Sequence, residues 1–256
     1  MRSQAKKLVK KLIPASLLRL YRARREAAAD LRLQKASAQD VFTEIYTRNL
    51  WGGAEGEFCS GPGSVEPAIV YPYLAMVQKM AAREGFSGMS FVDLGCGDFR
   101  VGSQLVPLSG NYVGVDVVAP LIEFNQEKYG SASVQFVHLD IVKDELPVGD
   151  VCFVRQVLQH LSNEQISLIL PKLAKYQWVF ITEHHPASEP IAKNLDKTQG
   201  GGIRATRGSG VYLDAAPFSL PASSLELVLE VARTGEGAEN DPGVLRTFLY
   251  KSGARG

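Results

Sequence analysis

The spacing of apolar and polar residues divides the chain into a helical first part and a second part in which short strands alternate with helices. In the first part, apolar residues recur three and four positions apart, which is the period of an amphipathic helix. Helices are predicted over residues 4–13, 16–35, 38–50 and 67–84. From residue 90 onward, short apolar runs bounded by turn residues predict strands. These strands cover residues 90–95, 111–116, 134–139, 150–154 and 178–182, with helices over 119–129 and 163–174.

This alternation predicts a doubly wound α/β fold with a parallel, Rossmann-like sheet. A long segment rich in Gly, Pro and Ser follows over residues 186–224. Two further apolar runs, over 225–232 and 244–251, predict an antiparallel hairpin that closes the sheet at its C-terminal end. The expected organisation is a basic helical extension over 1–37, a helical cap with a Gly-rich loop over 38–89, and the sheet-containing core over 90–256.

The net charge of +1 is a cancellation between two parts of the chain. Residues 1–35 contain eleven Lys and Arg but only two acidic residues, whereas the rest of the chain contains 17 basic and 25 acidic residues. A basic amphipathic segment suits peripheral association with an anionic membrane surface or an acidic partner. The acidic remainder argues against a nucleic-acid partner, because domains that bind nucleic acids present basic surfaces.

The cysteine content and the length of the apolar runs bear on location. Cys59, Cys96 and Cys152 form no closely spaced pair, which fits a reducing compartment. No apolar run approaches the roughly 20 residues that a transmembrane helix needs. We therefore expect a cytoplasmic protein, with residues 1–35 as a candidate segment for contact with the inner face of the membrane. The acid-poor start leaves an organelle transit peptide as an alternative.

The segment FVDLGCGD, residues 91–98, carries the most specific chemical signal. A buried strand enters a turn with Gly95 and Gly97, whose lack of a Cβ lets the backbone approach a ligand closely. A dinucleotide fingerprint would need a further glycine where the chain has Arg100. Asp93 on the preceding strand would repel a pyrophosphate but could receive an ammonium group. The pattern therefore indicates a ligand with an amino-acid end.

Two later strands each place a carboxylate at their carboxyl end. Asp116 follows the glycines by about 20 residues, the spacing at which an acid accepts hydrogen bonds from ribose hydroxyls. Asp140 can accept from an adenine amino group, and Ile141 can pack on the ring. In order along the chain, the three strand ends therefore supply groups for an amino acid, a ribose and a base.

On these motifs, residues 90–182 resemble the class I S-adenosylmethionine-dependent methyltransferases, and the closing hairpin agrees with the seven-stranded sheet of that family. The resemblance implies S-adenosylmethionine as the cofactor. It implies that Asp93, Gly95 and Gly97 line the methionine end, with Asp116 at the ribose and Asp140 at the adenine. The third glycine of the family motif corresponds to Phe99 in this chain. Further residues on these loops are expected in the same site, namely Asp98, Phe99, Val117, Ile141, Arg155 and Gln156.

A narrower resemblance extends toward the N-terminus. The segments NLWG over residues 49–52, SGPGS over 60–64 and CGDF over 96–99 are similar to a group of mostly bacterial methyltransferase-domain proteins, some of them associated with surface-glycan pathways. The resemblance implies that the first two segments fold over the cofactor as part of the cap. The residues that it adds to the cofactor site are Trp51, Gly52 and Ser64.

The candidate catalytic residues follow the fourth and fifth strands. No Asn/Asp-Pro-Pro-Tyr motif, by which many amino-group methyltransferases bind a planar nitrogen, follows the fourth strand, which favours an oxygen acceptor. A hydroxyl acceptor must lose its proton during methyl transfer, and a neutral imidazole suits that role. The candidate bases are His160, His184 and His185, with Glu183 as an orienting residue or alternate base. Adjacent side chains on a strand point to opposite faces, so we expect no metal held by the His-His pair.

The predicted function is therefore O-methylation of a small-molecule or glycan acceptor by an S-adenosylmethionine-dependent methyltransferase. Asp93 and Arg100 argue against the alternative of a nicotinamide-dependent oxidoreductase. A second alternative stays open, in which the chain is a non-catalytic cofactor-binding module that its basic N-terminal helix recruits to a membrane or complex. Such a module would keep Asp116 and Asp140, so these residues do not separate the two hypotheses.

Overall fold

The computed structural model describes residues 32–33, 35–54, 56–233 and 243–251. The chain divides into two compact units, Met1–Ser37 and Ala38–Gly256. The helix predicted over residues 4–13 and most of the one predicted over 16–35 lie outside the described residues.

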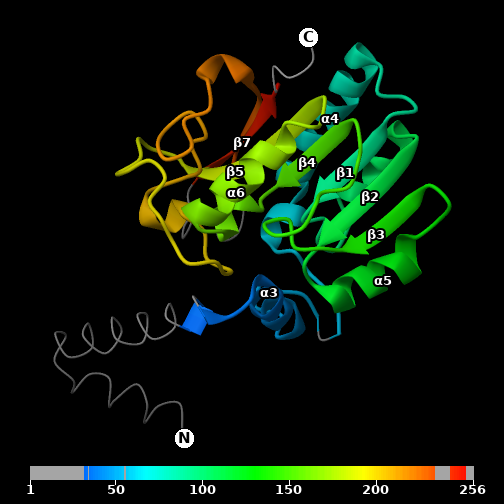
Figure 1. Cartoon of the computed structure of the whole chain (residues 1–256), viewed down its shortest axis with the longest axis horizontal. Helices are drawn as coiled ribbons and strands as arrows, with labels where there is room; N and C mark the ends of the chain where they lie inside the picture. Colours follow the sequence, from blue (N-terminus) through cyan, green and yellow to red (C-terminus); the bar gives the residue numbers. More distant parts are fainter. Residues whose placement is uncertain (1–31, 34, 55, 234–242, 252–256) are drawn as a thin grey trace, which may run out of the picture. The chain divides into compact units, whose positions relative to one another are not determined.

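The second unit is built on one mixed sheet of seven strands (Figure 1). The strands are β1 (Ser90–Leu94), β2 (Asn111–Asp116), β3 (Val134–His138), β4 (Val151–Arg155), β5 (Trp178–Pro186), β6 (Leu225–Ala232) and β7 (Gly243–Tyr250). Their order in the sheet is β3-β2-β1-β4-β5-β7-β6. Strands β1 to β5 are parallel, and β7 pairs antiparallel with both β5 and β6. The predicted α/β fold with a closing antiparallel strand pair is therefore confirmed.

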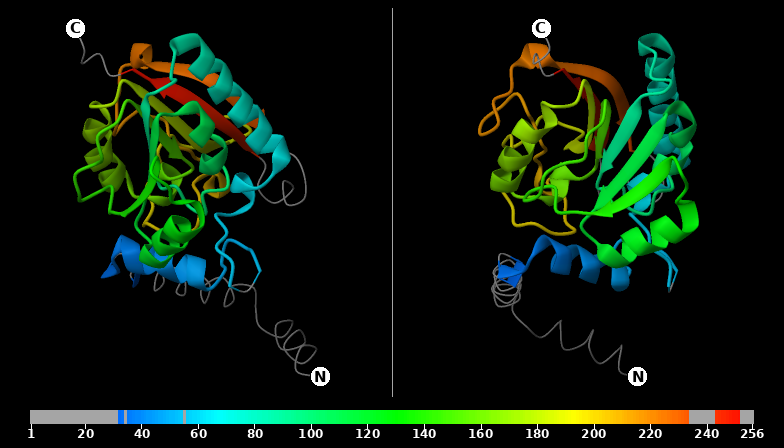
Figure 2. Two further views of the ribbon diagram at one scale, coloured as in Figure 1. Left: turned by 90° about the vertical axis from the view of Figure 1, so that its right-hand side faces the viewer. Right: turned by 45° about the vertical axis from the view of Figure 1, so that its right-hand side comes forward.

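Helices cover both faces of the sheet. Those on the faces are α4 (Pro67–Glu84), α5 (Ala119–Tyr129) and α6 (Asn163–Leu173), whereas α3 (Ala38–Thr47) lies beyond the carboxyl ends of the parallel strands and contacts α5 (Figure 1). Helices α4 and α6 lie on opposite sides of the sheet (Figure 2). The central strands are buried on both faces, which explains why their sequences are nearly continuous apolar runs.

An aromatic core lies between α4 and the sheet. The rings of Phe91 and Phe153, on adjacent strands, have centroids 5.2 Å apart, and Phe153 stacks on Phe180 at 5.4 Å. Phe86, in the turn after α4, packs against both Phe91 and Phe180 and is fully buried. This packing holds β1, β4 and β5 at fixed positions, so the loops at their carboxyl ends start from a rigid base.

Two predicted boundaries were wrong. The helix predicted over 38–50 ends at Thr47, and residues 48–50 form a turn. The fifth strand was predicted to end at Thr182, but β5 continues to Pro186 because β7 pairs with it along this stretch, with His184 opposite Leu245 and His185 opposite Val244. The Glu183-His184-His185 segment therefore lies within a strand. Among the described residues, no helix has the length and apolar character to cross a membrane.

Candidate functional site

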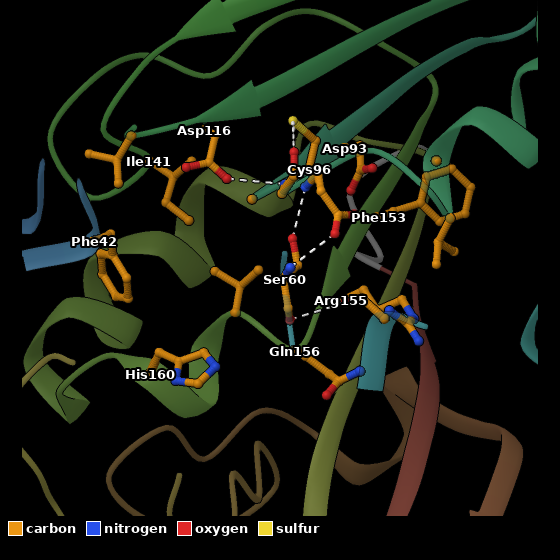
Figure 3. A pocket seen from close by; sticks show the side chains of 18 of the residues that line it. Phe42, Ser60, Asp93, Cys96, Asp116, Ile141, Phe153, Arg155, Gln156 and His160 are labelled. Carbon is orange, nitrogen blue, oxygen red and sulfur yellow. Dashed lines mark hydrogen bonds between the residues drawn. The ribbon is translucent and has the colours of Figure 1, made fainter. Parts of the chain in front are cut away.

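A cavity opens at the carboxyl ends of the parallel strands, and α3 and the loop before α4 contribute to its wall (Figure 3). It brings together most of the residues that the sequence predicted for the cofactor. Those that line it are Trp51, Ser64, Asp93, Gly95, Gly97, Asp98, Asp116, Val117, Asp140, Ile141, Arg155 and Gln156. His160, a predicted base, lines the same cavity. Residues from α3 to the turn after β4 thus converge on one site.

The turn after β1 depends on its two glycines. Gly95 and Gly97 have positive φ angles of 77° and 56°. A Cβ on Gly97 would lie 2.3 Å from the Ser60 Oγ, and one on Gly95 would lie 2.5 Å from a methyl group of Val157. Phe99, which replaces the family's third glycine, has a φ of 60° and so adopts a backbone conformation that favours glycine.

The Gly-rich loop is attached to this turn by a reciprocal pair of hydrogen bonds. The Ser60 N–H donates to Asp98 Oδ2 at 2.9 Å, and the Asp98 N–H donates to Ser60 Oγ at 2.8 Å. The Tyr46 hydroxyl on α3 lies 2.9 Å from the same Ser60 Oγ. Asp98 is 4% exposed. The cap and the glycine turn therefore form one connected wall of the cavity.

Two buried carboxylates face the cavity from β1 and β2. Asp93 accepts a hydrogen bond of 3.0 Å from the Tyr112 hydroxyl. Asp116 accepts from the N–H groups of Gly97 and Val118, each at 3.1 Å. Burial raises the pKa of each carboxyl to about 6, against the hydrogen bonds that lower it. A positively charged ligand would restore the ionised form of both groups.

The predicted adenine end lies on the turn after β3. Asp140 accepts from the Val142 N–H at 3.0 Å, and Lys143 lies 3.3 Å from its carboxylate. Ile141 beside it is buried. Asp140 therefore keeps a carboxylate at the cavity, next to an apolar surface.

Arg155 and Gln156, which end β4, face the Gly-rich loop. The Arg155 guanidinium donates to the Gly63 carbonyl at 2.6 Å and lies 5.1 Å from the centre of the Tyr73 ring. Gln156 has a φ of 57°, an uncommon conformation for a non-glycine residue. Its side chain packs against Gly63, where a Cβ would lie 2.3 Å from Gln156 Oε1.

His160 lies at the end of the short 3-10 turn η4 (Leu158–His160). Its Nδ1 lies 3.2 Å from the Gly200 carbonyl oxygen, and its ring centroid lies 5.0 Å from that of Trp51. A carbonyl oxygen only accepts, so Nδ1 carries the hydrogen and Nε2 carries the lone pair. Burial, with a smaller contribution from Lys197, lowers the pKa of His160 to about 3, which keeps the imidazole neutral at pH 7.

Glu183 lies behind this turn and does not line the cavity. Its carboxylate accepts from the N–H groups of Val157, Leu158 and Gln159 at 3.2, 2.9 and 3.0 Å. Burial raises its pKa to about 8, and the three donated hydrogen bonds oppose that shift. Glu183 therefore holds in place the turn that carries His160.

The two histidines of β5 point to opposite faces, as expected for neighbouring strand residues. His184 lines a second cavity, which shares Trp51, Ser60, Gln156 and His160 with the first. His185 lines neither cavity; it packs edge-on against Tyr212 at 4.9 Å, and burial lowers its pKa to about 3. Within the described ranges, no three His, Cys, Asp or Glu side chains are grouped to hold a metal ion.

Two predicted cofactor residues do not line the cavity. Gly52 lies in the turn after α3, exposed and with nothing within 4 Å of the position of a Cβ. Phe99 points into the core, where its ring packs on Tyr112 and Phe136 at 5.2 and 4.7 Å. Its left-handed backbone turns the side chain away from the site, which the sequence pattern did not indicate.

Phe42 and Tyr46 also line the cavity and were not predicted from the sequence, whereas Ser60 lies in the segment predicted to fold over the cofactor. The helical period correctly placed Phe42 and Tyr46 on the buried face of α3. However, a periodicity signal does not distinguish a face that packs on the core from one that lines a cavity. Ser60 lay within a predicted cap segment, and only its pairing with Asp98 across 38 residues reveals its role.

Residues 92–174 match the family described as methyltransferase domains. Among curated proteins, this chain is 28% identical over 79 residues to uncharacterised methyltransferases of Mycobacterium bovis and Mycobacterium tuberculosis. That match covers 30% of this chain and 40% of the length of each relative.

Solved structures of low sequence identity share the fold. A Bradyrhizobium japonicum N-methyltransferase, NodS, bound to S-adenosylhomocysteine gives a TM-score of 0.52 at 13% identity, covering 73% of this chain and 90% of NodS. The Burkholderia thailandensis 1,6-didemethyltoxoflavin-N1-methyltransferase gives 0.55 at 16% identity, covering 89% and 90%. The [4+2]-cyclase SpnF gives 0.53 at 14% identity, covering 84% and 97%, so the fold alone does not determine the reaction. Residues 92–174 are therefore similar to a methyltransferase domain, and they lie within a fold that solved methyltransferases share.

Proposed function

We propose that this protein transfers a methyl group from S-adenosylmethionine to a hydroxyl oxygen of a small-molecule or glycan acceptor. The observation that carries the proposal is that three strand-end acids, Asp93, Asp116 and Asp140, line one cavity together with the imidazole of His160. The three carboxylates match the ammonium, ribose and adenine groups of the cofactor, and the histidine lines the same cavity.

The residues of the cavity fit this cofactor. Asp93 would receive the ammonium group, Asp116 the ribose hydroxyls and Asp140 the adenine amino group. The turn beside them requires Gly95 and Gly97, because a Cβ there would collide with Val157 or Ser60. When bound, S-adenosylmethionine supplies a methyl group activated by its positively charged sulfur. The two buried carboxylates of raised pKa are suited to a ligand that carries positive charge.

His160 would act as the base that accepts the proton of the acceptor hydroxyl. The Gly200 carbonyl orients the ring through Nδ1, so the proton would arrive at Nε2. The Nε2 atom lies 3.3 Å from the Gln159 carboxamide nitrogen, which is the group that an acceptor hydroxyl would displace. His184, on the wall of the second cavity, is the next candidate.

The proposal is tested with radiolabelled S-adenosylmethionine and a cell lysate fractionated into glycan, lipid, protein and small-molecule pools. We expect the protein to bind S-adenosylhomocysteine in calorimetry and to transfer label to the glycan or small-molecule pool as a base-stable ether. Binding with no label in any pool would favour the non-catalytic module. Label in a methylated amine would contradict an oxygen acceptor, and no binding at all would contradict the cofactor assignment.

A further inference from the structure

The second cavity lies directly beside the proposed cofactor site. It is lined by residues of the Gly-rich loop, of the segment after β4, of β5 and of the 200–206 segment. It shares His160 and Gln156 with the first cavity, so these two side chains stand at the junction. A ligand that fills the second cavity would reach the first one beside the candidate base.

The described residues that line the second cavity offer hydrogen-bonding groups but no carboxylate. The side chains include the carboxamides of Gln156 and Gln159, the imidazole of His184 and the hydroxyl of Thr206, with the Trp51 indole as a flat apolar surface. None of the described residues that line the cavity is Asp or Glu, so a cationic amine would find no opposite charge there.

Among the described residues of this wall, the one permanently charged side chain, Arg233, already has a partner. The Arg233 guanidinium lies 4.0 Å from the carboxylate of Glu66, which precedes α4. The pair leaves the cavity close to neutral. The wall therefore suits an uncharged ligand with many hydroxyl groups better than it suits an anion or a cation.

Gln156 has a feature that points to a ligand. Its left-handed backbone places the carboxamide against Gly63, and its Nε2 is buried with no hydrogen-bond partner in the part of the chain that the structure describes. A buried amide donor without a partner is costly, so such groups in proteins are usually satisfied by a ligand or water. An oxygen atom bound at the junction would satisfy this donor.

We propose that the second cavity is the acceptor site, that it takes an uncharged polyhydroxylated ring, and that Gln156 Nε2 positions one ring oxygen substituent beside His160. This inference rests on the proposed function, which it deepens by naming the class of acceptor and the residues that bind it. Gln156 acts here as a specificity-determining residue, because a site that donates to a hydroxyl rejects analogues that lack it.

The chain offers a variant that fills this cavity and leaves the cofactor cavity open. Gly202 lines only the second cavity, is exposed at its edge, and has nothing within 4 Å of the position of a Cβ. Gly202→Trp would therefore block the cavity without displacing the backbone. Val148→Trp is the matched control, because Val148 is 89% exposed and lines neither cavity.

The experiment measures saturation-transfer NMR of three probes in the presence of S-adenosylhomocysteine. The probes are methyl β-D-glucopyranoside, D-glucosamine and cyclohexanol, which represent an uncharged polyol, a cation and a ring with one hydroxyl. We expect the glucoside signal to exceed the other two by about tenfold, because each lacks groups that the site requires. The signal should be lost in Gly202→Trp, fall about tenfold in Gln156→Leu, and persist in Val148→Trp.

Calorimetry with S-adenosylhomocysteine on the same variants separates the two proposals. Cofactor-product affinity that stays within about twofold of the wild type in Gly202→Trp and Val148→Trp shows that a loss of the glucoside signal in Gly202→Trp concerns the second cavity. Gln156 lines both cavities, so the glucoside signal of Gln156→Leu is compared at a concentration of S-adenosylhomocysteine that saturates that variant. A glucoside signal that persists in Gly202→Trp, an absent glucoside signal, or an equal signal from cyclohexanol or glucosamine would overturn this inference while S-adenosylhomocysteine still binds. Failure of S-adenosylhomocysteine to bind the wild type would instead overturn the proposed function.

Discussion

At the scale of single residues, the site is dominated by two carboxylates that the fold keeps out of water. Asp93 and Asp116 are each 8% exposed, and burial raises the pKa of both to about 6. Because ionisation of a buried carboxyl is unfavourable, the ligand-free protein takes up protons at these sites as the pH falls toward 6. A cation that binds there must displace those protons.

Cofactor affinity should therefore depend on pH. We expect the affinity for S-adenosylmethionine to be constant above about pH 7 and to fall by up to about tenfold per pH unit for each group below pH 6, because the protonated carboxyls no longer attract a cation. Calorimetry between pH 5 and 8, in buffers of different ionisation enthalpy, measures both the affinity and the protons released. An affinity that is unchanged at pH 5 would show that these two carboxyls do not face the ligand's charge.

A substitution isolates the second carboxylate. Asp116→Asn keeps one oxygen for the N–H groups of the turn but removes the charge, and we expect cofactor binding to weaken by about 1–3 kcal/mol. Glu123→Gln, an exposed acid on neighbouring α5, is the control and should have no effect. Equal affinities of the two variants, measured by calorimetry, would rule out Asp116 as the ribose ligand.

The histidine base has its own test. In His160→Gln we expect kcat to fall by about 100-fold or more, because the acceptor proton loses its base, while cofactor affinity stays within about twofold. Single-turnover kinetics and calorimetry measure the two quantities. His138→Gln is the control, since His138 is exposed and lines neither cavity. A parallel loss of affinity and rate in His160→Gln would indicate a structural role.

At the scale of elements, the turn η4 is fixed at both ends by buried polar side chains. The Glu183 carboxylate accepts from three of its N–H groups. Arg204, which is 1% exposed, donates to the carbonyls of Leu158 and Leu161 at 3.1 and 2.7 Å. An acid at the amino end and a cation at the carboxyl end complement the dipoles of the turn. The position of His160 therefore depends on β5 and on a loop 40 residues further along the chain.

Removing one end of this support should reduce stability. Glu183→Gln replaces one acceptor oxygen by a donor that faces backbone N–H groups, so we expect the free energy of unfolding to fall by about 1–3 kcal/mol. Urea denaturation measures this change. Glu226→Gln, a half-exposed glutamate on β6, is the matched control and should leave stability within about 0.5 kcal/mol. A wild-type stability for Glu183→Gln would show that the turn does not depend on this carboxylate.

The sequence predicted the parallel sheet, the closing hairpin and the strand-end acids of the cavity, because short-range patterns carry that information. The glycine turn and the strand-end acids are each defined within a few residues. By contrast, the true end of β5 depends on pairing with β7, about 60 residues away. Likewise, the inward turn of Phe99 depends on its left-handed backbone and on the aromatic rings around it. Tertiary contacts of this kind leave no periodic signal in a single sequence.

At the scale of the whole molecule, charge separates the two parts of the chain. The basic residues concentrate in positions 1–35, whereas every residue of the proposed cofactor site lies in the Ala38–Gly256 unit. The two parts should therefore be separable in function. A role of the basic part in membrane association stays a prediction from the sequence.

Deletion of residues 1–37 tests that separation. We expect S-adenosylmethionine affinity to stay within about twofold, while sedimentation with vesicles of phosphatidylcholine and phosphatidylglycerol should fall to the level seen with phosphatidylcholine alone, because each basic residue near an anionic surface contributes about 1 kcal/mol. Circular dichroism verifies that the shortened protein is folded. Vesicle binding that survives the deletion would contradict the prediction, as would a folded protein that no longer binds the cofactor.

The reciprocal hydrogen bonds between Ser60 and Asp98 join the segment that matches the methyltransferase family to a residue outside that segment. The segment recognisable by homology, residues 92–174, contains the acids of the cavity but not Ser60, Tyr46 or Trp51. It also lacks β5 and β7, which contribute His184 and Leu245 to the wall of the second cavity. A match confined to residues 92–174 therefore does not cover the residues that complete the two cavities. Relatives matched only over that segment can share a donor pocket and still differ in what they methylate.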